Sequence, residues 1–300
     1  VKNYTLIIAE KPDAAERIAL ALNPNFKKKV EYKIPYYELE KNGEKIFVVP
    51  ASGHVYTVTQ TIGGRDYYPV FTFDWAPKYE VEKGAKRTKN IIKLFKKLGS
   101  KAGELINASD FDVEGSLIGY TILKYACNGR ENEAKRMKFS TLTTNDLRKA
   151  YESLLPHIEF PVVEAGLCRH FLDALYGINL SRAMTVSAKN WSGKYSTLSI
   201  GRVQGPTLKF LVDREKEINS FIPTPYWSIK AKIKVKGLIY EAEYEKEVIR
   251  TKSEADLIVD SCKNKIGKIS RIEVRKILQK PPTPFDLGAL QTEAYALFKY

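Results

Sequence analysis

The chain has 300 residues, 44% of them hydrophobic, which is enough for two or three domains with buried cores. Its apolar runs are too short to cross a membrane, and we expect no secretion signal, which together indicate a cytoplasmic protein. The three cysteines are widely spaced, which argues against a disulfide framework or a zinc ribbon. The net charge of +14 indicates either a solvated lysine-rich surface or a polyanionic partner.

The first half of the chain alternates strand-like and helix-like segments. Apolar runs at helical spacing follow short buried runs, and this order is typical of βαβ units around a parallel sheet. A cap at Thr144 or Asn145 is expected to open one more helix. We predict strands at 6–9, 45–49, 105–108 and 137–140, and helices at 14–22, 84–98 (strongly basic) and 115–125.

The pattern changes after residue 150. Two helices flank a polar loop at 192–201, and a mostly two-periodic stretch at 223–274 indicates antiparallel strands. A final helix, opened by Asp286 or Leu287, meets no capping signal before Tyr300, so we expect a truncated chain or a split gene. We predict helices at 161–187, 206–218 and 253–263, and strands at 227–235 and 238–244.

Four carboxylates stand at the ends of two of the early apolar runs. Glu10 follows the first run, and a triplet follows a later one: Asp110, Asp112 and Glu114. Functional groups of an open α/β sheet gather beyond the carboxyl ends of its strands. Carboxylates that converge there repel one another unless a divalent cation or a shared proton intervenes. Oxygen ligands suit Mg²⁺, and Lys11 adds a positive charge, so we predict an Mg²⁺ site next to a phosphate.

Structural roles compete with this interpretation. Glu10 could cap the helix that follows it, the triplet could be an acidic helix N-terminus, and a lysine after a strand is usually a surface residue. Asp110 and Asp112, however, lie two residues apart on a strand-like segment, which would point both carboxylates to one side. This spacing favours metal binding by the pair, with Glu114 assisting.

Several motifs resemble one protein family. The acidic triplet, followed by Gly115, resembles the Toprim domain of topoisomerases, bacterial-type primases and some nucleases. The Ser-x-Gly-Arg-Val-Gln segment at 199–204 resembles a signature of the type IA DNA topoisomerases, which primases and type II enzymes lack. Three further segments resemble motifs of the same family in the same order: Glu10–Pro12, Arg169–Gly177 and Pro284–Gln291.

The resemblance implies a domain order. It implies an α/β Toprim domain with a central parallel sheet at 1–150, then the first part of a helical DNA-binding domain at 151–222. A β-rich arch segment would occupy 223–280, and 281–300 would begin the return toward a domain that carries the nucleophilic tyrosine. The composition is similar to that of thermophilic archaeal proteins.

The resemblance also implies an activity. Type IA enzymes cut one DNA strand with Mg²⁺ through a 5′-phosphotyrosine and reseal it without ATP, which relaxes negatively supercoiled DNA in the nucleoid. Glu10 and Lys11 would be catalytic, and Mg²⁺ would bind Asp110, Asp112 and Glu114 together with Glu10. Single-stranded DNA would be bound by a second set of residues: His54, Arg169, Asp173, Ser199, Arg202 and Gln204.

The residues expected to bind DNA also have ordinary structural interpretations. A lone His is more often structural, Arg169 and Asp173 have the spacing of an i, i+4 ion pair, and 199–204 could be an ordinary loop-to-helix junction. An ion pair is compatible with function, because Asp173 could hold Arg169 toward a DNA phosphate.

The sequence departs from the family pattern at several points. Val113 stands where the family has Arg, Ser116 where it has a further acid, and His170 where some members have Arg. No Ser-Tyr-x-Arg-Thr-like motif for the nucleophile occurs in the 300 residues. The chain could therefore be a non-catalytic, single-strand DNA-binding half that needs a partner carrying the tyrosine. A Toprim nuclease or primase is a third alternative, which the segment 201–204 disfavours.

Overall fold

The computed structural model describes residues 4–64 and 67–299. The chain divides into two compact units, Val1–Asn219 and Ser220–Tyr300. No helix within the described ranges combines the length and the apolarity that crossing a bilayer requires.

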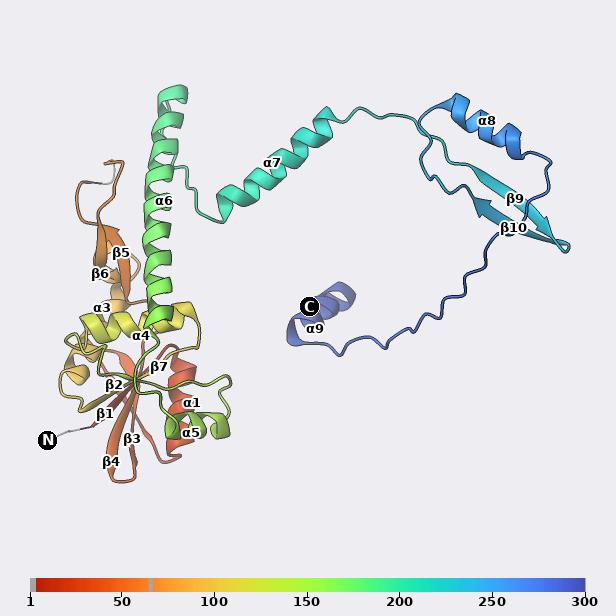
Figure 1. Cartoon of the computed structure of the whole chain (residues 1–300). Helices are drawn as coiled ribbons and strands as arrows, with labels where there is room; N and C mark the ends of the chain where they lie inside the picture. Colours follow the sequence, from red (N-terminus) through yellow and green to blue (C-terminus); the bar gives the residue numbers. More distant parts are fainter. Residues whose placement is uncertain (1–3, 65–66, 300) are drawn as a thin grey trace. The chain divides into compact units, whose positions relative to one another are not determined.

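The first unit is built on a six-stranded sheet with the order β2-β3-β4-β1-β7-β8 (Figure 1). Its centre is parallel, and β2 and β3 add an antiparallel edge. The sequence prediction of an α/β domain with a parallel sheet at its centre is therefore confirmed. The strands are β1 (Thr5–Ala9), β2 (Lys27–Glu31), β3 (Ile34–Lys41), β4 (Glu44–Pro50), β7 (Glu104–Ala108) and β8 (Lys135–Arg136).

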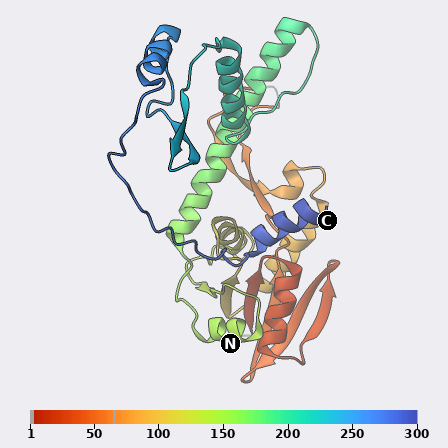
Figure 2. The same ribbon diagram turned by 90° about the vertical axis from the view of Figure 1, so that its right-hand side faces the viewer.

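Helices cover both faces of this sheet (Figure 2). Every residue of β1 is buried, because Leu6 packs into the core on one face and Ile7 into the core on the other. Central strands of parallel sheets have this continuous apolar character. The first face is covered by α3 (Lys86–Gly99) and α4 (Val113–Tyr125), and the second by α1 (Pro12–Leu22) and α5 (Thr144–Glu152).

A long helix, α6 (Phe160–Ser192), leaves the sheet domain beside α4 (Figure 1). It begins with a proline in its first turn and ends at Gly193, whose φ of 69° is the left-handed conformation that suits a helix C-cap. A hairpin of β5 (Tyr56–Gln60) and β6 (Phe73–Pro77), followed by α2 (Lys78–Val81), runs along it. The Asn179 amide ties helix and hairpin together, because it bonds both backbone groups of Val70.

The last helix of the first unit is α7 (Gln204–Ser220). The second unit contains an antiparallel hairpin, β9 (Lys230–Val235) and β10 (Leu238–Glu243), whose register pairs Leu238 with Val235. The helices α8 (Lys252–Cys262) and α9 (Leu287–Phe298) follow, and the Asp286 carboxylate caps α9 as expected. Tyr300 lies outside the described residues.

Two local predictions are wrong. The last short strand is β8 (Lys135–Arg136) rather than 137–140, and the cap of α5 is Thr143 rather than either of its two successors. The sequence prediction also missed four strands. The edge strand β2 is almost entirely exposed and lysine-rich, and β3, β5 and β6 are short or irregular in pattern, so hydrophobic periodicity does not mark them.

Candidate functional site

Glu10, Lys11 and Asp110 meet at the carboxyl ends of two neighbouring parallel strands. The register of β1 and β7 pairs Ala9 with Ala108, so the residues that follow them emerge side by side. The Lys11 Nζ lies 2.6 Å from the Asp110 Oδ2 and 3.4 Å from the Glu10 Oε1. This group is called the strand-end cluster below; the sequence predicted a convergence of four carboxylates, and two of them, Glu10 and Asp110, meet here.

The strand-end cluster is crowded, and it leaves one carboxylate oxygen without a partner. A side chain at Gly115 would clash with the backbone oxygen of Asp110 and would come within 2.8 Å of the Glu10 Oε2. That Oε2 is buried and has no hydrogen-bond partner among the described residues. Burial, followed by the nearby charge of Asp110, raises the pKa of Glu10. The cluster therefore holds more negative charge than Lys11 neutralises.

Asp112 has a different setting from the one predicted. The strand β7 ends at Ala108, so Asp110 and Asp112 lie in the loop before α4 and not on a strand-like segment. Asp112 is the N-cap of α4, and its Oδ1 accepts a hydrogen bond from the Gly115 N–H at 2.6 Å. The capping role, which was one of the alternatives, is present at this residue.

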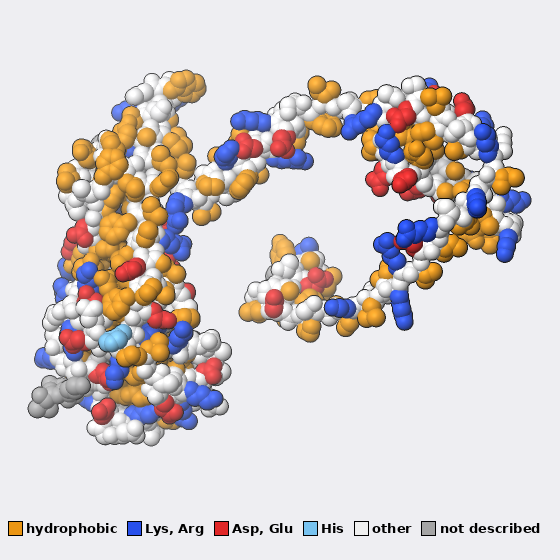
Figure 3. Space-filling model, viewed as in Figure 1, with side chains coloured by type: hydrophobic (Ala, Val, Ile, Leu, Met, Phe, Trp, Pro, Cys, Tyr) orange, Lys and Arg blue, Asp and Glu red, His pale blue; other side chains and the backbone are white. Residues whose placement is uncertain are grey.

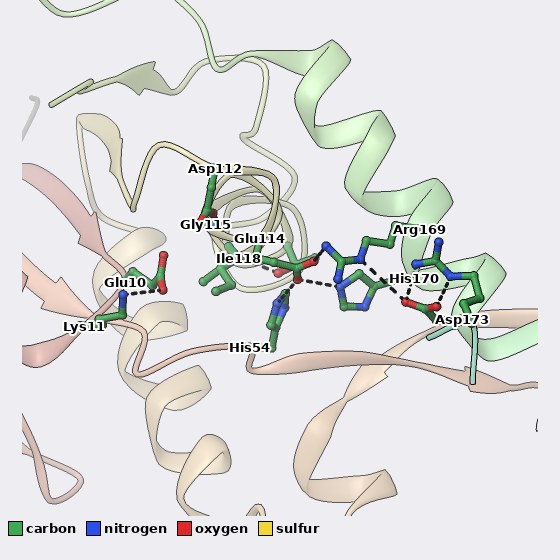
Figure 4. A network of polar contacts seen from close by, with 12 residues as sticks. Glu10, Lys11, His54, Asp112, Glu114, Gly115, Ile118, Arg169, His170 and Asp173 are labelled. Atoms are coloured by element: carbon green, nitrogen blue, oxygen red, sulfur yellow. Dashed lines mark hydrogen bonds and ion pairs between the residues drawn. The ribbon is translucent and has the colours of Figure 1, made fainter. Parts of the chain in front are cut away.

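Glu114 belongs to a second group, shown in Figure 4. Its Oε2 lies 2.9 Å from the Nε2 of both His54 and His170, and its Oε1 lies 3.1 Å from a guanidinium nitrogen of Arg169. His54 follows β4, Glu114 opens α4, and the other two residues lie on α6, so three separate segments meet here. This group is called the Glu114 cluster below.

The electrostatics of the two clusters differ. Burial alone would raise the pKa of Glu114, but hydrogen bonds from His170 and His54 outweigh it and lower that pKa. Burial lowers the pKa of His54, against the effect of its bond to Glu114. Two imidazoles and one carboxylate within 4.8 Å of one another could also hold a metal ion. Donors already surround Glu114, whereas Glu10 keeps an oxygen free.

Asp173 pairs mainly with Arg202. The Arg202 guanidinium donates to both carboxylate oxygens of Asp173, one of them at 3.1 Å, and this bond lowers the pKa of Asp173. The predicted pair with Arg169 is long, at 3.9 Å, because Arg169 turns toward Glu114. Arg202 is thereby held beside α6, near Arg169.

The polar loop before α7 is fixed along α6. Hydroxyls one helical turn apart, on Ser181 and Thr185, accept hydrogen bonds at 3.0 Å from the backbone N–H groups of Ile200 and Leu198. Ser199 lies between these two anchor points and is exposed, as is Gln204 at the start of α7. The loop thus presents polar side chains to solvent from an ordered backbone.

Arg136 is a residue that the sequence reasoning missed. Its side chain is 1% exposed, and its guanidinium donates to the backbone oxygens of Asn107, Ser109, Asp110 and Met137. Burial lowers its pKa, whereas four surrounding carboxylates, including Asp110 and Glu10, oppose that shift. Arg136 therefore stabilises the loop that carries the acidic residues, through hydrogen bonds to backbone oxygens of that loop. A lysine–arginine pair in a two-residue strand gives no signal of this in sequence.

Comparison with known proteins matches the two parts of the chain separately. The sequence profile of the Toprim domain matches residues 5–142, and a profile described as DNA topoisomerase matches residues 157–300. The chain belongs to the type IA DNA topoisomerase family.

Individual relatives agree with this assignment. DNA topoisomerase 1 of Pyrococcus furiosus is 48% identical over 298 residues, which is 98% of this chain and 28% of the relative. The enzyme of the same name from Pyrococcus horikoshii is 47% identical over 98% of this chain and 43% of the relative. DNA topoisomerase 3 of Staphylococcus haemolyticus is 31% identical over 98% of this chain and 40% of the relative. The chain spans less than half the length of these topoisomerases.

The two clusters differ in which family match supplies their residues. The strand-end cluster lies wholly within the Toprim match, and Toprim domains in general bind Mg²⁺. The Glu114 cluster takes His54 and Glu114 from the Toprim match, and Arg169 and His170 from the topoisomerase match. The unpartnered oxygen of Glu10, close to Asp110, fits the needs of a hard cation.

Proposed function

We propose that this chain supplies the Mg²⁺ site and part of the single-strand DNA-binding surface of a type IA topoisomerase. The complete reaction is cleavage and religation of one strand through a 5′-phosphotyrosine, which relaxes negatively supercoiled DNA without ATP. The observation that carries the proposal is the convergence of Glu10, Lys11 and Asp110 at the ends of β1 and β7.

Glu10, Asp110 and Asp112 are the residues that would hold Mg²⁺. The raised pKa of Glu10 and its unpartnered oxygen support this, because a cation would relieve the repulsion from Asp110. Bound there, Mg²⁺ would offset negative charge on the reacting phosphate. Glu114 is a weaker candidate ligand, because both of its oxygens already have donors.

Glu10 and Lys11 would act on the scissile phosphodiester. When the tyrosine oxygen attacks phosphorus, the 3′ oxygen leaves with a negative charge and needs a proton. While it is not bound to the cation, a Glu10 carboxyl with a raised pKa is suited to give that proton and to take it back during religation. Lys11 is 60% exposed, so its ammonium can turn from the carboxylates to a phosphate oxygen.

Residues along α6 and the loop that follows it would bind the DNA strand. Arg169 and Arg202 offer exposed guanidinium groups that suit phosphates, and Asp173 orients Arg202. Ser199 and Gln204 would add hydrogen bonds from the ordered loop. His54 would act indirectly, by holding Glu114. Residues 223–280 would begin the arch of the gate.

The nucleophilic tyrosine would come from polypeptide that these 300 residues do not include, either in the same protein or in a partner. If this chain is a non-catalytic DNA-binding half, the same proposal holds, and the tyrosine comes from a separate partner chain. A Toprim nuclease is a different reaction, in which water replaces the tyrosine and no covalent adduct forms.

A cleavage assay tests the proposal. Labelled single-stranded DNA is incubated with the chain and Mg²⁺, stopped with denaturant and examined for a protein–DNA adduct. We expect the DNA to be bound but neither linked nor cut. An adduct would place the nucleophile among the tyrosines of this chain, and free 5′-phosphate ends without an adduct would indicate a nuclease. Absence of single-strand binding would contradict the proposal as a whole.

A further inference from the structure

The helix α3 has a charge pattern unlike that of an ordinary surface helix. No Asp or Glu occurs between Glu82 and Glu104. The apolar side of α3, which includes Ile91 and Phe95, packs into the core, so its charged side faces solvent. The cations of this segment, called the α3 stripe below, are Lys83, Lys86, Arg87, Lys89, Lys93, Lys96, Lys97 and Lys101.

This pattern costs helix stability. Like charges three or four residues apart repel one another, and cations are unfavourable near a helix N-terminus. The first turn of α3 contains no acid. The exposed helix α7 follows the usual solution, with Lys209 paired to Asp213 at 2.6 Å and Arg214 to Glu217 at 2.9 Å. A helix kept only for solubility would be expected to resemble α7.

Most of the α3 stripe has no counter-charge within the protein. Lys97 pairs with Glu31 of β2 at 2.5 Å, and Lys89 lies over the Tyr79 ring at 5.5 Å. Within residues 4–64 and 67–299, no ion pair engages Lys86, Lys93 or Lys96. These ammonium groups are therefore available to an external anion.

The spacing of the stripe suits a regular polyanion. Lys86, Lys93 and Lys96 are seven and three residues apart, so they lie on one side of the helix. At about 1.5 Å per residue, this row is roughly 15 Å long. Duplex DNA rises about 3.4 Å per base pair, so the row spans the backbone of roughly four base pairs.

We propose that the α3 stripe binds the sugar–phosphate backbone of duplex DNA. A straight row of lysines matches a duplex better than a flexible single strand. Single-strand sites also offer aromatic platforms for bases, whereas the aromatic residue of α3, Phe95, is fully buried. The inference rests on the proposed DNA-directed function and adds to it a contact with double-stranded DNA on a separate element.

The test compares two charge-matched variants of the whole chain. The first is Lys86→Gln/Lys93→Gln/Lys96→Gln, which keeps helix propensity close to that of the original. The control is Lys232→Gln/Lys234→Gln/Lys276→Gln, which removes three exposed lysines from the second unit. Binding to a blunt 20-base-pair duplex and to oligo(dT) of about the same length is measured over a series of salt concentrations. Thermal unfolding confirms that each variant is folded.

The stripe variant should bind the duplex about tenfold more weakly near 0.1 M salt, and its salt-dependence slope should fall by about 0.9 for each lost phosphate contact. Its affinity for oligo(dT) should change by less than about twofold. Equal losses in the control variant would mean that only net charge matters, and an unchanged duplex slope would mean a merely solvated helix; either result overturns the inference. If the unaltered chain bound neither DNA, the proposed function itself would fail.

Discussion

The two carboxylate clusters lie close in sequence and differ in how their charge is satisfied. In the strand-end cluster, Glu10 and Asp110 share one lysine, and a buried Glu10 oxygen has no partner within the described chain. In the Glu114 cluster, one carboxylate receives three donors. The pKa of Glu10 is raised and that of Glu114 is lowered. We infer that the first cluster is the one suited to a cation, because the carboxylate of the second already has protein donors on both oxygens.

The difference suggests separate tasks for neighbouring acids of one motif. Glu114 joins the loop after β4, α4 and α6, and so links the Toprim part of the chain to the helix that bears Arg169 (Figure 4). Hydrophobic side chains also run along the exposed length of that helix (Figure 3). We infer that Glu114 acts as an anchor between the two parts, and that Glu10 and Asp110 carry the chemistry.

The largest expected effect is on the free energy of unfolding, and it comes from Arg136, which holds the loop next to the strand-end cluster. Arg136→Met would remove the guanidinium that donates to the backbone oxygens of Ser109 and Asp110, which should lower the free energy of unfolding by about 3–5 kcal/mol. Urea unfolding measures the change. Arg130→Met is the matched control, because Arg130 also bonds backbone oxygens but is partly exposed, so it should lose much less. Equal losses would show that the Arg136 network has no special role.

The next largest expected effect is on the affinity for Mg²⁺. Asp110→Asn removes one of the two carboxylates of the strand-end cluster, so Mg²⁺ affinity should fall about tenfold or more, or by at least about 1.4 kcal/mol. The measurement is the rise in unfolding temperature as Mg²⁺ is added, which mass action relates to affinity. Asp213→Asn, which breaks an exposed pair on α7, should leave the rise unchanged. The same dependence in both variants would exclude a specific site at Asp110.

The sequence predicts the strand-end cluster better than the Glu114 cluster, for a physical reason. Apolar runs followed by acids identified β1 and β7, and neighbouring parallel strands bring their ends together. Two partners of Glu114, His54 and His170, lie 60 and 56 residues away along the chain, so only the tertiary fold brings them close: the loop after β4 carries His54, and the packing of α6 on α4 brings His170. Sequence analysis does not identify Arg136 for a similar reason, because its burial depends on the tertiary fold.

Glu114→Gln distinguishes an anchor from a metal ligand. The variant weakens the bonds to His54, His170 and Arg169, which at this half-exposed site should cost about 1 kcal/mol of folding free energy. Its Mg²⁺ affinity should stay within about threefold of the original, because Glu10 and Asp110 remain. A loss of Mg²⁺ affinity as large as that of Asp110→Asn would instead place Glu114 in the cation site.

The smallest effect is a pair of opposite pH dependences. The folded pKa of Glu114 lies below 4.5, so Glu114 contributes stability that is present above about pH 4.5 and is lost as pH falls through the lowered value. The folded pKa of Glu10 lies above 4.5, so its ionisation disfavours the folded state as pH rises through the raised value.

Without Mg²⁺, Glu10→Gln should therefore gain stability relative to the original chain as pH rises from about 4 to 7. Glu114→Gln should fall behind the original chain as pH rises through the lowered pKa of Glu114 toward about 4.5, and should then stay behind it by a constant amount. Parallel curves for the two variants would mean that the two clusters do not differ in charge balance, and the division between anchor and cation site would have to be abandoned.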